Sequence, residues 1–122
     1  MATLSVQPVI EAGVTPTYAS AASGGDVAPN DGTMFIHVKN EHGSATRTIT
    51  FTPSTTSVTD DNYGAVTKAA VALTVAAGGD EFIGPFKTTL WNNGSGQVAI
   101  TYSDSGANIK LAALSFDKDK IA

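Results

Sequence analysis

From residue 33 onward, apolar and polar residues alternate along short stretches that are separated by turn signals. In residues 33–39 the alternation predicts one face with Met34, Ile36 and Val38 and an opposite face with Phe35, His37 and Lys39. Because successive side chains of a strand point to opposite faces, a period of two predicts β-strands. The same character is found in four further stretches: residues 46–52, 68–76, 97–103 and 109–116. Residues 81–91 are interpreted as two short strands bent at Gly84-Pro85.

Turn residues between these stretches suggest how the strands connect. The turn at residues 40–44 predicts that 33–39 and 46–52 pair as an antiparallel hairpin. A helix over residues 63–77 is the competing interpretation, but the apolar residues there form no i, i+3, i+4 stripe and several are β-branched. The whole pattern predicts an all-β fold: a single antiparallel β-sandwich, jelly-roll-like, over residues 33–122.

The first 32 residues differ from the rest of the chain. They hold Pro8, Pro16 and Pro29 together with the pair Gly24-Gly25. Because proline has no backbone N–H to donate, it suits neither a helix interior nor a central strand. We therefore expect an extended N-terminal arm over residues 1–32, with at most a short strand near residues 4–10; a merely mobile terminus is the alternative.

Composition narrows the classes of function. The chain has 122 residues, no cysteine, 7 basic and 11 acidic residues, and a net charge of −4. We therefore expect no disulfide framework, no thiol chemistry and no nucleic-acid partner. No apolar run approaches the length of a membrane-spanning helix, so no membrane partner is expected. With 18 alanines, 16 threonines and 10 serines, the strands present small and hydroxylated faces that suit assembly with other protein surfaces.

Candidate chemistry is sparse. Residues 78–82 spell the GGDEF signature of diguanylate cyclases, but they follow an alternating strand and are interpreted as a Gly-Gly turn before the next strand. His37 and His42 lie in a strand and a turn, without a nucleophile elbow nearby. The acidic loop at residues 60–62 and the acidic residues of the tail lack calcium-loop spacing. The sequence thus predicts no enzyme, no catalytic residues, no cofactor and no metal.

One resemblance covers residues 30–116. Residues 30–40 have the pattern N-D-G-x-x-F-x-x-V-x-N. Residues 75–79 lead into Ile83–Phe86, and residues 98–103 precede the final stretch 109–116. This order resembles small all-β virion proteins of tailed bacteriophages, some of which are capsid decoration (cement) proteins.

The resemblance implies a structural protein on the outer capsid surface of a virion. It implies binding to the major capsid protein and a homo-oligomer, most simply a trimer. Our candidate interface residues are Val6, Val9, Val14, Tyr18, Tyr63 and Trp91, although Trp91 is also placed where a core lid would lie. The alternatives are a tail, neck or fibre component and a carbohydrate- or cell-surface-binding β-sandwich.

Overall fold

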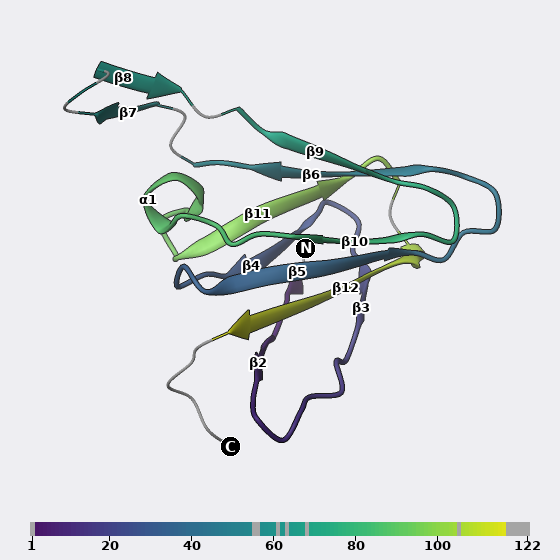
Figure 1. The fold of residues 1–122 in the computed structure, drawn as a ribbon. Coiled ribbons are helices and arrows are strands. Elements are labelled where there is room, and N and C mark those ends of the chain that lie inside the picture. Colours follow the sequence, from purple (N-terminus) through teal and green to yellow (C-terminus); the bar gives the residue numbers. More distant parts are fainter. Residues whose placement is uncertain are drawn as a thin grey trace.

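Two β-sheets pack face to face in the computed structural model, which describes residues 2–54, 57–60, 62, 64–67, 69–104 and 106–116 (Figure 1). The first sheet has the order β1 (Ala2–Thr3), β4 (Asp26–Pro29), β11 (Gln97–Tyr102), β6 (Arg47–Thr52), β9 (Val71–Val75). The second has the order β10 (Asp80–Ile83), β5 (Met34–Asn40), β12 (Gly106–Phe116), β2 (Val6–Val9), and β3 (Ala19–Ala21) also pairs with β12. A hairpin of β7 (Ser57–Asp60) and β8 (Gly64–Thr67) extends beyond the sandwich (Figure 1).

The all-β prediction is confirmed as a sandwich-like pair of sheets, but the purely antiparallel arrangement is wrong. β1 pairs with β4 in parallel, and β2 pairs with β12 in parallel. Both sheets are therefore mixed. The parallel pairs arise because the N-terminal segment crosses from the first sheet to the second between Thr3 and Val6 and runs along one edge of each.

The predicted extended arm over residues 1–32 is also wrong, because residues 2–29 supply four strands to the two sheets. β4 lies inside the first sheet, and Leu4, Ala21 and Ala28 belong to the hydrophobic core. The prolines are compatible with strands because of where they fall. Pro8 is on the edge strand β2, and Pro29 is the last residue of β4.

The predicted hairpin between residues 33–39 and 46–52 does not form. Both stretches are strands, but β5 lies in the second sheet and β6 in the first. The connection between them turns a corner that is held by the buried Asn40. Its Nδ2 donates to the carbonyls of Ala45 (2.8 Å) and Val75 (3.1 Å), and its Oδ1 accepts from the backbone N–H of His42. Because the hydrogen bonds of this buried amide are satisfied, Asn40 stabilises a connection that crosses between the sheets rather than a tight hairpin turn.

Residues 78–91 resolve two further predictions. The residues that spell GGDEF form a turn and the start of β10: Gly78 has φ +74°, and its N–H donates to the carbonyl of Asn40. The second strand expected in 81–91 is wrong, because residues 88–91 form the single helical turn α1 (Thr88–Trp91). This turn brings Trp91 edge-on to Phe86, with ring centroids 5.2 Å apart. The described residues within 63–77 form no helix, because β8 and β9 lie there.

The core lies between the sheets, where the predicted apolar faces meet. Met34, Ile36 and Val38 are fully buried on β5, as expected from the alternation. Phe51 of β6 stacks on Phe86 at 5.6 Å. The remaining buried residues come mainly from β9, β11 and β12: Val75, Val98, Ile100, Ile109, Leu111 and Ala113. Because this core is filled by apolar side chains, functional groups are to be sought on the outer surfaces.

Candidate functional site

An aromatic surface covers part of the outer face of the second sheet. We call it the aromatic face and define it by Tyr18, Phe35, His37, Phe82 and Phe116. Phe82 and Phe116 are the exposed large hydrophobic residues of the described chain, with 65% and 60% of their surface accessible. Phe35 and His37 alternate with the core residues of β5, so they point away from the core. Phe116 lies two residues beyond Leu114, which pairs with Phe35, and so shares this face.

Phe82 is held in place by its cross-strand neighbours. Register places Phe82 of β10 opposite His37 of β5. The two rings stack with centroids 4.2 Å apart and an interplanar angle of 10°. The ring of Phe35 lies 6.1 Å away at an angle of 51°. Such ring pairs restrict side-chain motion, so Phe82 presents a pre-ordered apolar surface to solvent.

His37 is the buried centre of this cluster. Its Nε2 lies 3.0 Å from the Asp80 carboxylate, and its Nδ1 lies 2.6 Å from the Tyr18 hydroxyl. An ionised carboxylate only accepts hydrogen bonds, so Nε2–H donates to Asp80. With the ring proton on Nε2, Nδ1 accepts a hydrogen bond from the Tyr18 hydroxyl. The chain Tyr18–His37–Asp80 therefore fixes the imidazole plane on which Phe82 stacks.

Tyr18 reaches His37 across a small residue of the intervening strand. Ala112 of β12 pairs with His37 of β5. On the other side of β12, Leu111 pairs with Ala19, so the same antiparallel register places Tyr18 alongside Ala112. A methyl side chain at Ala112 leaves room for the phenol ring. The Nζ of Lys39 lies 4.1 Å from the centre of that ring. The aromatic face is therefore flanked by one cationic group, Lys39, and one anionic group, Asp80.

A polar cluster on the first sheet has a structural role. Asp26, only 1% exposed, accepts hydrogen bonds from the backbone N–H groups of Ala2 (3.0 Å) and Ala22 (3.2 Å) and from the Tyr102 hydroxyl. Burial raises the pKa of Tyr102 far above its ordinary value, and the hydrogen bond to Asp26 and the negative charge of Asp26 add to this effect. These bonds tie the N-terminal strand to β11.

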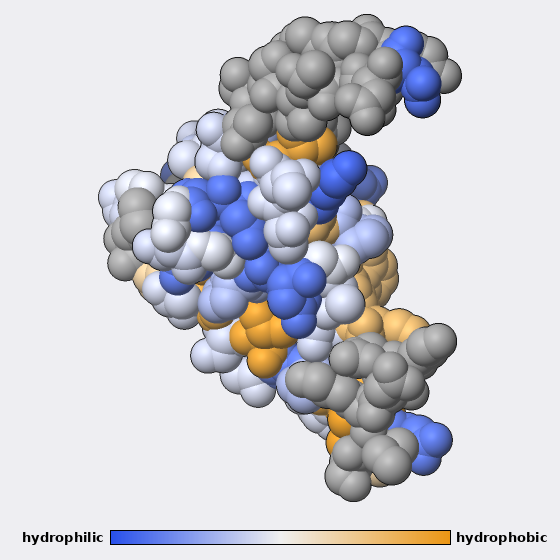
Figure 2. Space-filling view, turned by 90° about the vertical axis from the view of Figure 1, so that its left-hand side faces the viewer, coloured by the Kyte–Doolittle hydropathy of each residue, from blue (hydrophilic) through white to orange (hydrophobic). Residues whose placement is uncertain are grey.

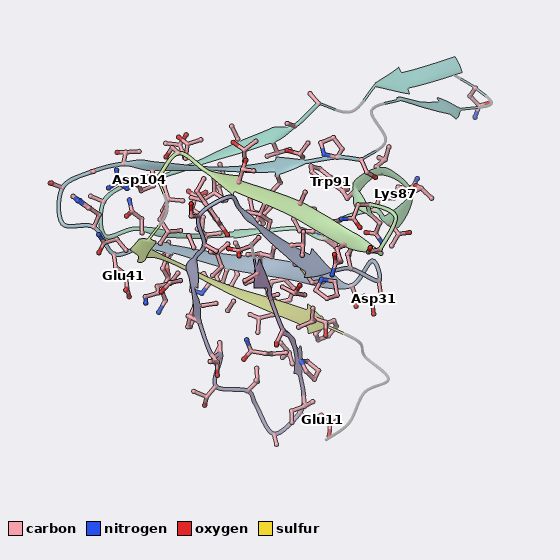
Figure 3. The ribbon with its side chains drawn as sticks, turned by 180° about the vertical axis from the view of Figure 1, so that it is seen from behind. Glu11, Asp31, Glu41, Lys87, Trp91 and Asp104 are labelled. Atoms are coloured by element: carbon pink, nitrogen blue, oxygen red, sulfur yellow. The ribbon has the colours of Figure 1, made fainter. Side chains whose placement is uncertain are left out.

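The candidate interface residues predicted from sequence fall in different places. Tyr18 belongs to the aromatic face. Val6 and Val9 lie on β2, where Val6 packs against the core, and Val14 is half-buried in the connection to β3. Trp91 is a buried core residue at the end of the sandwich that carries α1 (Figure 3). Tyr63 lies outside the described residues.

Sequence reasoning missed Phe82, Phe116 and Asp80, and it did not link Tyr18 to His37. The signal was present, because the alternation of residues 33–39 placed Phe35 and His37 on a face that a solvent-exposed sheet would fill with polar residues. Which distant residues join them depends on strand pairing. On the end of the molecule shown in Figure 2, hydrophobic residues also gather in separate patches among hydrophilic ones.

Other kinds of site have little support in the part of the chain that the structure describes. No three His, Asp or Glu side chains converge there as metal ligands, and no described helix could cross a membrane. The predicted acidic loop at 60–62 and the acidic tail fall largely outside the described side chains. A surface cavity of about 400 Å³ between β2 and β3 is lined by Thr3, Ser5, Gln7, Thr17 and Tyr18, without a charged side chain.

Comparison with known proteins identifies no relative: no family model, no curated protein and no solved structure matches this chain.

Proposed function

We propose that this protein is a structural component of a bacteriophage virion: a capsid decoration protein that binds the major capsid protein on the outer capsid surface and stabilises the shell. The partner class comes from the resemblance over residues 30–116. The observation that carries a binding role is the aromatic face, with Phe82 exposed yet held by His37 and Phe35.

Aromatic residues of this kind are suited to anchoring a protein interface. Interface energy concentrates in a few large side chains that are buried on binding, and ordering them beforehand reduces the entropy lost on association. Asp80 and Lys39 beside the rings supply charged groups of both signs for a polar rim. A protein that binds only the assembled shell stabilises it by mass action.

The experiment is a binding assay on expanded capsids purified without this protein. The wild-type chain should bind in many copies. Phe82→Ala should weaken binding about 30-fold, the effect of losing a hot-spot residue worth about 2 kcal/mol. Thr101→Ala is the matched control, because Thr101 is exposed on the first sheet, away from the aromatic face, and its loss should leave binding unchanged.

Counting copies in purified virions separates the alternatives. A high copy number on the shell supports the decoration role. A low copy number at the tail or neck, or absence from the particle, would overturn it in favour of a tail, neck or fibre component or a non-virion role.

A second candidate function is carbohydrate binding. The aromatic face combines the exposed Phe82 ring with the Asp80 carboxylate at His37 and the Lys39 ammonium group over Tyr18, and so joins an apolar surface to hydrogen-bonding groups. A glycan array that finds a ligand whose binding Phe82→Ala abolishes, together with no binding to capsids, would favour this candidate.

A further inference from the structure

The open edges of the two sheets differ in how they are protected against pairing with another chain. Exposed edges of native sheets are usually shortened, charged or interrupted by proline, because their unpaired backbone groups recruit other strands. β1 is an edge of two residues, and β2 contains Pro8. β10 begins with Asp80 and Glu81, which place charged side chains on this edge.

β9 has none of these devices. It is five residues long, has the sequence VALTV, and pairs with β6 on one side, with no described strand on the other. Residues 69–79 contain no charged residue and no proline. Ala72 and Thr74 are exposed on the outer face, while Val71 and Leu73 are only partly buried against the core.

We infer that β9 pairs with β9 of a second copy of this chain, antiparallel and related by a two-fold axis at Leu73. The strand is self-complementary in this arrangement. Leu73 lies opposite Leu73 of the second copy, Val71 opposite Val75, and Ala72 opposite Thr74. Every opposed pair is uncharged, and pairs of aliphatic and β-branched side chains stabilise neighbouring strands.

The contact completes two features that a single copy leaves open. It gives hydrogen-bond partners to backbone groups on the open side of β9, and it covers Val71 and Leu73 at the edge of the core. Two five-stranded sheets become one continuous sheet across the two-fold axis. This isologous contact gives a dimer, whereas a trimer would need two different surfaces to meet in a closed ring. The inference does not depend on which partner the aromatic face binds.

The test introduces charged side chains at Ala72 and Thr74, the two exposed positions of β9. The variants A72K/T74K and A72E/T74E each place two like-charge pairs across the proposed contact. Light scattering over a concentration series should show a dimer for the wild type. For each variant alone, the dissociation constant of the dimer should be at least about tenfold higher. An equimolar mixture of the two variants should form a heterodimer, because both substituted pairs then join lysine to glutamate.

Thr101→Lys is the matched control, because Thr101 is exposed on the same face of the same sheet but on the central strand β11. It should dimerise as the wild type does. Circular dichroism confirms that each variant is folded. A wild-type chain that stays monomeric or forms trimers, or a mixture of variants that does not associate, would overturn the β9 contact.

Discussion

Replacing Gly25 with alanine tests how closely β4 must approach β11. Gly25 immediately precedes β4 and has φ +95°, and a Cβ added there would lie 2.4 Å from the carbonyl oxygen of Ile100. Ile100 pairs with Asp26 in the neighbouring strand, so the obstacle is backbone that no rotamer change can remove. Gly24 has a similar φ of +86°, but nothing lies within 4 Å of its added Cβ.

The two glycines therefore separate conformational strain from steric collision. A left-handed conformation costs an L-residue about 1–2 kcal/mol, which is the loss expected for Gly24→Ala. Gly25→Ala adds the displacement of β4 from β11, which weakens ladder hydrogen bonds worth about 1 kcal/mol each. We expect a total loss of about 3 kcal/mol or more in the free energy of unfolding for Gly25→Ala.

Urea unfolding followed by tryptophan fluorescence measures both losses. Trp91 is the single tryptophan and is buried beside Phe86, so its emission reports the folded core. Equal losses for the two variants would refute the close approach of β4 and β11 at Gly25.

Three further predictions concern the polar cluster, the core and the aromatic face. Because burial beside Asp26 raises the pKa of Tyr102 above its ordinary value of 10, the unfolded chain ionises this group first. Stability should fall as the pH rises above about 10, by about 1.4 kcal/mol per pH unit, and Tyr102→Phe should remove that component in urea titrations at several pH values. Phe51→Ala should cost about 3–5 kcal/mol, because Phe51 is fully buried, and a smaller loss in denaturant melts would contradict its place in the core. Phe82→Ala should change stability by less than about 1 kcal/mol, since Phe82 is mostly exposed, and a large thermal destabilisation would assign it a structural role.

The candidate site was only partly predictable. The alternation in residues 33–39 placed Phe35, His37 and Lys39 on one face, and Tyr18 was predicted as an interface residue. Nothing local linked Tyr18 to His37, which lie 19 positions apart, or His37 to Asp80, which lie 43 apart. For Trp91 the sequence left both a core role and an interface role open, and α1 decides for the core by directing the side chain inward.

The sequence by itself determined the strands β5, β6, β9, β10, β11 and β12 and which of their faces are apolar, but not the strands of residues 2–29 or the hairpin of β7 and β8. These properties depend on side-chain alternation, which is local to each strand. It did not determine which strands pair. The connection between β5 and β6 could close a hairpin or cross between sheets, and the proline-containing N-terminal segment could extend outward or run along two sheet edges. Tertiary structure decided both, because burying Leu4 and Ala28 and satisfying Asn40 and Asp26 require partners that are distant in the chain.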